Sequence, residues 1–219
     1  MNTFTEENYL KAIFHLSPAG ESVSTNQIAA SLSTRAASVT DMLKKLADKS
    51  LINYVPYQGV NLTPEGQKIA VQIIRKHRLW EYFLVEKLSF KWDEVHEMAE
   101  ELEHISSIEL VNRLDDFMSH PKFDPHGDPI PDRNGNIRAN DLIPVSSLSD
   151  GDCGVVSGVR DHSVNYLKYL EKNCLTIGQH VRMIERNDYD HSVVLQIDNK
   201  DNKRVQISRE AANNLLIAQ

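Results

Sequence analysis

Cysteine is scarce in this chain of 219 residues, which has only Cys153 and Cys174. They lie far apart in the sequence and neither belongs to a CxxC pair, the spacing that most thiolate metal sites use. The scarcity therefore argues against a metal site built from thiolates. We expect two reduced cysteines in or near a folded core.

Long apolar runs are also missing. No run approaches the roughly 20 residues that a membrane-spanning helix needs. The first residues are acidic and lack the basic region and apolar core of a secretory signal. We therefore expect a cytoplasmic protein without a membrane partner, long enough for two or three domains.

The common enzyme motifs are absent as well. The sequence contains no HExxH, no GxSxG, no P-loop and no GxGxxG. No glutamate lies between two histidines at the spacing that zinc hydrolases use for a general base. An enzyme is unsupported, and we expect the chain not to be one.

The net charge of -7 is unevenly distributed along the chain. Residues 1–76 carry eight Lys or Arg against six Asp or Glu, whereas residues 77–219 carry sixteen against twenty-five. The acidic excess therefore lies outside the first part, and the total charge does not argue against DNA binding by that part.

Three short helices and a hairpin are predicted in the first part. Apolar residues recur at helical spacing in 5–16, where Thr5 could act as the cap, in 24–32, where Ser24 or Thr25 could do so, and in 36–48. Residues 51–63 indicate two strands joined around Gln58-Gly59. A tight turn between the second and third helices, followed by a hairpin, is typical of a winged helix-turn-helix.

The most informative segment is 93–104, which holds two histidines and six carboxylates in twelve residues. On a helical period, His96, Glu100, Glu103 and His104 would share one face of a single helix over about 92–105. Imidazole and carboxylate beside a buried seam suit a divalent transition metal. A solvated acidic face is the alternative, but it does not explain why both histidines share the face with the carboxylates.

Two further helices, over about 64–87 and 107–118, complete a middle region. Thr63 and Pro64 begin the first of them, and it carries His77 and Glu81 at i, i+4, which His96 could meet. The helices have more apolar surface than one pair needs, which suggests a helical dimer interface.

After an irregular segment, 120–144, the apolar period changes towards two. Short strands are predicted within 154–159, 180–184, 192–197 and 204–207, with a helical turn near 164–170 and a possible closing helix over 211–217. The predicted fold class is therefore α+β: an N-terminal winged helix-turn-helix domain (1–73), an all-α dimerisation and metal-binding domain (74–141) and a small SH3-like β-barrel (142–219).

Four stretches together carry a family resemblance. Arg75-Lys-His-Arg-Leu-x-Glu81, Val95-His96, Glu103-His104 and Pro121-Lys-Phe-Asp-Pro-His-Gly-Asp-Pro-Ile-Pro131 resemble the diphtheria toxin repressor family of iron- and manganese-dependent transcriptional regulators. The resemblance extends over nearly the whole chain. It implies a homodimeric repressor of metal-uptake genes that binds a double-stranded DNA operator when metal is bound.

The resemblance also implies two metal sites per chain. The primary site would use Asn8, Glu100, Glu103 and His104, and the ancillary site His77, Glu81 and His96, with Asp124, His126 and either Asp161 or His162. Iron-sensing members have methionine and cysteine where this chain has Asn8 and Glu100, and manganese-sensing members commonly have aspartate at the first position. Oxygen and imidazole ligands suit Mn²⁺, with Fe²⁺ as the alternative.

By the same resemblance, the outer face of the third helix would contact DNA. Its residues there are Arg35, Ala36, Ala37, Ser38, Thr40, Asp41 and Lys44. Alanine methyl groups could contact thymine, and Arg35 could read guanine or bind phosphate. The wing, Tyr57 to Gly59, would touch the DNA backbone or minor groove.

Two other functions remain open from the sequence. A winged-helix regulator could sense an organic ligand while its acidic helix is merely solvated. A metalloenzyme fused to a winged helix is the more distant alternative, because it would need an open coordination position in a substrate-sized cleft.

Overall fold

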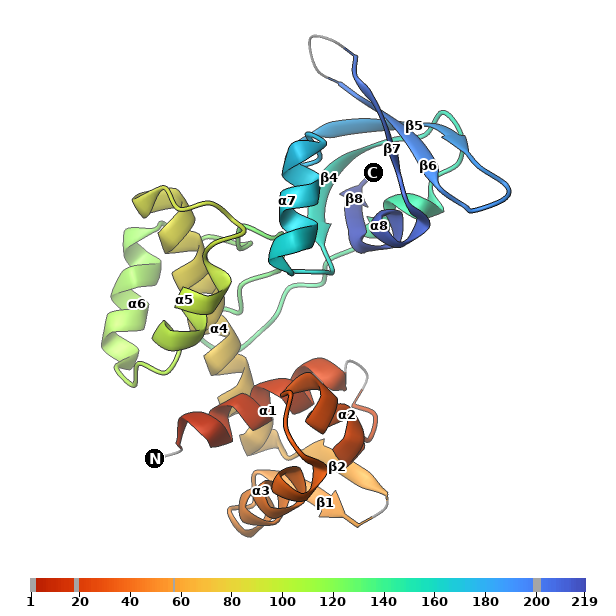
Figure 1. Cartoon of the computed structure of the whole chain (residues 1–219). Coiled ribbons are helices and arrows are strands. Elements are labelled where there is room, and N and C mark those ends of the chain that lie inside the picture. Colours follow the sequence, from red (N-terminus) through yellow and green to blue (C-terminus); the bar gives the residue numbers. More distant parts are fainter. Residues whose placement is uncertain (1–2, 18–19, 57, 199–201) are drawn as a thin grey trace. The chain divides into compact units, whose positions relative to one another are not determined.

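The computed structural model describes residues 3–17, 20–56, 58–198 and 202–219. The chain divides into two compact units, and helix α4 (Pro64–Leu88) contributes residues to both. The first unit comprises Met1–His77, Glu101–Asn112 and Pro131–Asn136; the second comprises Arg78–Glu100, Arg113–Ile130 and Ile137–Gln219. Figure 1 shows the elements of each. Among the described residues, no helix has the length and apolar character to cross a membrane.

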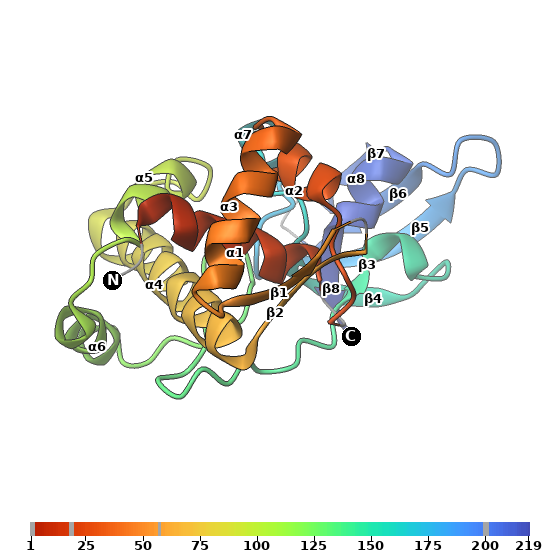
Figure 2. The same ribbon diagram turned by 90° about the horizontal axis from the view of Figure 1, so that it is seen from below.

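The first unit begins with three helices and a hairpin. These are α1 (Phe4–Leu16), α2 (Thr25–Ser31), α3 (Ala36–Asp48), β1 (Ile52–Val55) and β2 (Gly59–Leu62). Figure 2 shows α3 beside the hairpin. The predicted wing is therefore present, although Tyr57 lies outside the described residues.

Capping residues set the starts of these helices. Thr3, and not Thr5, caps α1, and the Glu6 side chain completes a capping box by accepting from the Thr3 backbone. Ser24 forms the same box with Gln27 at the start of α2. The prediction of Thr5 was wrong because an earlier threonine, one residue before Phe4, has the required extended backbone and a glutamate three residues later.

The core of this part is apolar and closed. Residues from α1, α2, α3 and the hairpin are fully or almost fully buried, including Leu10, Ile13, Ile28, Leu43 and Val60. Because the inward faces of α1 and α3 enter the same core, the outer face of α3 is left for solvent and ligands.

Two shorter helices follow α4: α5 (His96–Leu102) and α6 (Ile108–Phe117). The predicted helix over 92–105 was too long at both ends. Trp92 to Val95 form turns, and Glu103 and His104 lie in the turn that follows α5. The four proposed ligands therefore do not all project from one helical face.

The C-terminal part of the second unit is a six-stranded antiparallel sheet with strand order β3-β8-β4-β5-β6-β7. The strands are β3 (Ile143–Pro144), β4 (Cys153–Val159), β5 (His180–Arg186), β6 (Val193–Ile197), β7 (Arg204–Ile207) and β8 (Leu215–Ala218). A short 3-10 helix (Val145–Ser147) follows β3, and α7 (Val164–Lys172) and α8 (Arg209–Asn214) carry further core residues. Figure 1 labels α7 and α8 together with most strands of this sheet.

Two details of this domain differ from expectation. Only 209–214 are helical near the end, and 215–218 form β8, which pairs with both β3 and β4. Leu215 and Ile217 are fully buried, so pairing in the sheet overrides the helical pattern. Cys153 and Cys174 are both exposed, contrary to the expectation that they lie in or near the core.

Candidate metal centres and DNA-binding face

The first unit brings α1 and the turn after α5 together through charged side chains. Glu103 is fully buried, and His77 Nδ1 lies 2.7 Å from its Oε2. Lys11 Nζ lies 2.6 and 2.9 Å from its two carboxylate oxygens. Burial alone would raise the pKa of Glu103, but His77 and Lys11 hold it below its ordinary value. Glu103 is therefore a buried carboxylate that keeps its negative charge.

His104, the next residue, faces the same helix. Its Nδ1 lies 2.7 Å from Glu7 Oε2, and its ring stacks on Phe4 with centroids 4.5 Å apart. The family resemblance pointed to Asn8 on α1, whereas the contact of His104 in the structure is with the neighbouring Glu7. Asn8 Oδ1 is buried without a hydrogen-bond partner among the described residues, so it is an oxygen that still lacks a donor or cation.

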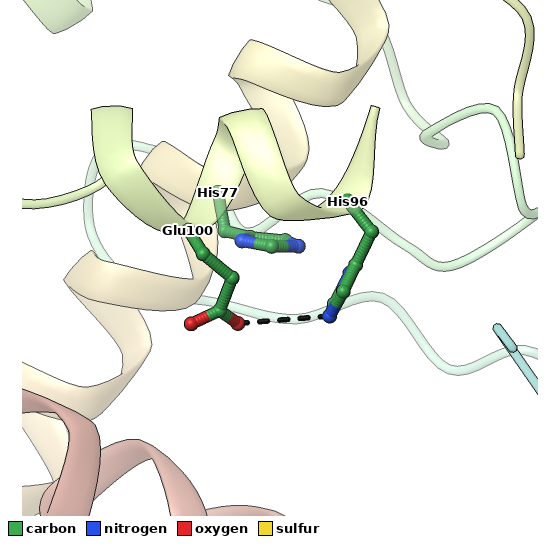
Figure 3. A group of neighbouring side chains, drawn as sticks. All are labelled: His77, His96 and Glu100. Carbon is green, nitrogen blue, oxygen red and sulfur yellow. Dashed lines mark ion pairs between the residues drawn. The ribbon is translucent and has the colours of Figure 1, made fainter. Parts of the chain in front are cut away.

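The second unit contains a separate group of possible ligands. Glu81 on α4 and Asp124 and His126 in the loop after α6 are all buried, and one ligand atom of each lies within 4.8 Å of the others. His96 Nδ1 lies 3.2 Å from Glu81 Oε1. Figure 3 shows His96 with Glu100 one helical turn further along α5, and the two side chains form an ion pair of 3.7 Å.

The loop that carries Asp124 and His126 is held by hydrogen bonds to the Asp124 carboxylate and by close packing at Gly127. Asp124 Oδ1 accepts the N–H groups of His126 and Asp128 at 2.8 and 3.0 Å. Gly127 has φ +88°, and a Cβ there would clash with the Ser157 carbonyl oxygen, so no other residue fits without a shift. Asp124 Oδ2 faces Arg78, whose Nε is 3.6 Å away.

The chemistry of His126 suits a ligand. Its Nε2 lies 2.8 Å from the Trp92 carbonyl oxygen, which can only accept, so Nε2 carries a proton. Nδ1 is buried without a hydrogen-bond partner among the described residues and lies 3.5 Å from Glu81 Oε2. Metal-ligating histidines are oriented by this kind of second hydrogen bond.

The pKa values of Asp124 and His126 are both raised by their surroundings. Burial, with the nearby carboxylates of Glu81 and Asp128, raises the pKa of Asp124 to about 7. Burial alone would lower the pKa of His126, but Glu81 and Asp124 raise it to about 9. A buried carboxyl group that holds its proton near neutral pH can exchange that proton for a divalent ion.

The alternative between Asp161 and His162 can be compared directly. Asp161 Oδ1 accepts the Ser163 N–H at 2.8 Å, a turn contact before α7. The His162 ring stacks on His126 with centroids 4.8 Å apart, and its Nε2 lies 3.8 Å from Asp128 Oδ2. His162 therefore lies at this group, whereas Asp161 has a local structural role.

The outer face of α3 is open. Arg35, Ala36, Ala37, Ser38, Asp41 and Lys44 are exposed, and Thr40 is half-buried with its hydroxyl donating to the Ala36 carbonyl at 3.0 Å. Lys44 Nζ lies 3.5 Å from Asp41 Oδ1. This ion pair is exposed, so solvent and salt screen its attraction. Small side chains at the start of α3 leave its backbone able to approach a DNA groove.

Family profiles match the chain in three consecutive parts. Residues 1–60 match the iron dependent repressor N-terminal DNA binding domain, 63–132 its metal binding and dimerisation domain, and 143–219 the FeoA domain. A solved manganese-dependent transcriptional repressor in complex with manganese is 31% identical, with a TM-score of 0.88 over 97% of this chain and 99% of that one. The chain belongs to the diphtheria toxin repressor family.

Relatives from two genera of bacteria agree with this family. The iron-dependent repressor IdeR of Mycobacterium tuberculosis is 32% identical over 127 residues, 58% of this chain and 55% of that protein. The match thus spans about half the length of this curated relative. The diphtheria toxin repressor of Corynebacterium diphtheriae is 26% identical over 207 residues, 90% of each protein.

Membership confirms the predicted α+β fold class with its DNA-binding, helical and SH3-like parts. The family consists of metal-dependent transcriptional repressors and not of enzymes, which removes the metalloenzyme alternative. The family's divalent metal dependence also stands against a regulator whose acidic residues are merely solvated.

Proposed function

We propose that this chain is a homodimeric, metal-dependent repressor that binds a double-stranded DNA operator and controls genes for metal uptake. The observation that carries the proposal is the pair of contacts that join α1 of the DNA-binding part to the turn after α5, through Glu7–His104 and Lys11–Glu103. A ligand held by Glu103 and His104 would therefore fix α1, and with it α3, in one arrangement. For a DNA-binding regulator of this kind we expect the cytoplasm as the location.

We propose Mn²⁺ as the corepressor, with Fe²⁺ as the alternative. The groups near the turn after α5 are carboxylate, amide and imidazole, and the exposed cysteines are not among them. Hard oxygen and nitrogen ligands without thiolate suit Mn²⁺, which supplies a positive charge that neutralises converging carboxylates. The full primary set of Asn8, Glu100, Glu103 and His104 remains a prediction.

We propose a second metal site per chain in the second unit. Glu81, Asp124 and His126 would be its centre, with His96 beside Glu81 and His162 stacked on His126. Its residues come from α4, α5, the loop after α6 and the segment before α7. The site would therefore link the SH3-like part to the helices that carry it, within one unit.

The test is DNA binding at fixed salt, because phosphate contacts make affinity depend steeply on salt. The chain's own upstream DNA and metal-transporter promoters are titrated in EDTA, then with Mn²⁺, and with Fe²⁺ under anaerobic conditions. We expect retention only with metal, abolished in Glu103→Gln and preserved in Glu101→Gln, whose side chain is exposed on α5. Binding in EDTA, or by Glu103→Gln in metal, would contradict the proposal.

A further inference from the structure

Two charged pairs connect α1 to the turn after α5, and both engage groups assigned above to the primary metal site. The Lys11 ammonium contacts both oxygens of Glu103, at 2.6 and 2.9 Å. The Glu7 carboxylate contacts His104 Nδ1 at 2.7 Å. Lys11 and Glu7 therefore each pair with a side chain that would be needed to bind metal.

The Lys11–Glu103 pair is enclosed. The Glu103 side chain is 0% exposed and that of Lys11 is 13% exposed, so solvent screens their attraction little. His77 lies on the Glu103 Oε2 side, and the nearby Lys76 ammonium is directed to the Ile105 carbonyl, 3.5 Å away. The Lys11 ammonium thus occupies the Glu103 carboxylate, which a metal ion would need as a ligand.

Glu7 and Lys11 are also related to each other. They are four residues apart on α1, with the glutamate nearer the N-terminus, which is the favourable order for an ion pair on a helix. If Glu103 and His104 turned to a metal, the two released side chains could pair along α1. On α1, Glu7 and Lys11 are therefore alternative partners for each other.

We propose that Lys11 is a built-in competitor for the corepressor metal, and that metal loading exchanges two pairs, Lys11–Glu103 and Glu7–His104, for a Glu7–Lys11 pair within α1. This inference rests on the proposed function. The competition sets the concentration of metal at which the site fills, because metal binds only by displacing the ammonium. Lys11 is a residue that tunes affinity, and it is not itself a ligand.

The test is Mn²⁺ binding by calorimetry on the full chain, with thermal unfolding of the metal-free and Mn²⁺-saturated protein. In Lys11→Gln the Mn²⁺ affinity at the primary site should rise at least tenfold. The unfolding temperature should fall without metal and stay near the wild-type value with Mn²⁺, because the Lys11–Glu103 pair exists only in the metal-free protein. Lys11→Arg, which keeps the charge, should bind Mn²⁺ as the wild type does.

A matched control uses Glu6, another residue of α1, and its partner Lys49 at the end of α3. Lys49 Nζ contacts both oxygens of the buried Glu6 at 2.8 Å, the same kind of pair outside the metal site. Lys49→Gln should lower the unfolding temperature equally with and without Mn²⁺ and leave the affinity unchanged. Wild-type affinity in Lys11→Gln, with an equal loss of stability in both states, would show a purely structural role and overturn the inference alone. A wild-type chain that binds no Mn²⁺ would overturn the proposed function with it.

Discussion

At the level of single residues, Glu6 makes the stability of the first unit depend on pH. Burial alone would raise its pKa, but hydrogen bonds from Lys49, the Thr3 backbone and Lys45 lower it to about 2. Because this folded-state pKa lies below the ordinary value of 4.5, the charged Glu6 stabilises the fold above pH 4.5. That contribution is lost as the pH falls towards 2.

Replacing Glu6 by glutamine should remove this dependence. We expect Glu6→Gln to lower the free energy of unfolding at pH 7 by about 2 kcal/mol, the scale of hydrogen bonds to a charged group. Between pH 4.5 and 2 the variant should lose less stability than the wild type. Denaturant unfolding across this range measures both effects, with the exposed Glu65→Gln as control. Parallel pH curves for Glu6→Gln and the wild type would refute the assignment.

His126 allows the proposed second site to be tested separately from the first. We expect His126→Ala to reduce bound Mn²⁺ by one ion per chain. The substitution removes an imidazole whose Nδ1 would bind the metal while its Nε2 is fixed by the Trp92 carbonyl. Equilibrium dialysis with metal analysis counts the ions. The exposed His180→Ala on β5 should bind the wild-type number. An unchanged count in His126→Ala would eliminate the site.

Residue types and spacing singled out the candidate ligands on 77–104, and the family resemblance supplied the others, but neither predicted their pairing. Nothing in the sequence distinguishes Glu7 from Asn8 as the partner of His104, since the two are adjacent and both carry oxygen. Nor could the sequence predict that His162 stacks on His126, because this contact depends on how the segment before α7 meets the loop after α6. These pairings depend on tertiary structure. The capping boxes at the starts of α1 and α2, such as Glu6 three residues after Thr3, are instead local signals in the sequence.

At the level of elements, α3 is the part whose function depends most on its exposed face. Arg35 is exposed and precedes the first turn, where it makes no side-chain cap hydrogen bond. We expect Arg35→Ala to weaken operator binding about 10- to 100-fold, in the range of one specific base contact, with unfolding unchanged. Fluorescence anisotropy at fixed salt and saturating Mn²⁺ measures the effect.

The control for this variant is Arg182→Ala, an exposed arginine on β5. It removes the same charge from a part of the chain that the DNA-binding profile does not cover. If both variants lost affinity equally, the effect of Arg35 would be one of overall charge, and its place on the DNA face would be disproved.

The boundaries of α3 were predicted correctly and those of α5 were not, for a physical reason. In α3 the apolar stripe ends where the helix ends, so periodicity marks the boundary. In α5 the spacing of the candidate ligands continues through Glu103 and His104, but the helix ends at Leu102, and these two residues contact Lys11 and Glu7 on another helix. The helix predicted over 211–217 was wrong at its end for a similar reason. Residues 215–218 form β8, whose two strand partners are distant in sequence.

At the level of the whole molecule, the proposed homodimer needs an apolar surface. α6 provides one, since Ile108, Leu110 and Phe117 are 76, 43 and 66% exposed in the single chain. We expect Phe117→Glu to weaken dimerisation at least tenfold, because an apolar contact would be replaced by a buried charge. Sedimentation velocity measures the state of assembly, and operator binding should fall with it.

A matched substitution on another helix serves as the control. Val164 is 42% exposed on α7, and Val164→Glu places the same charge on an apolar surface outside the dimerisation profile. It should leave the dimer intact. Dimers in Phe117→Glu, or monomers in Val164→Glu, would move the interface away from α6.

The position of β8 between β3 and β4 has a consequence for how the domain is made. During synthesis β3 emerges long before the only strand it pairs with, so the sheet cannot close while most of the domain is being translated. Ile143 and Val156 must wait for Ile217 to cover them. The domain therefore folds late and through contacts of high sequence separation, which fold slowly and leave apolar surface open to chaperones.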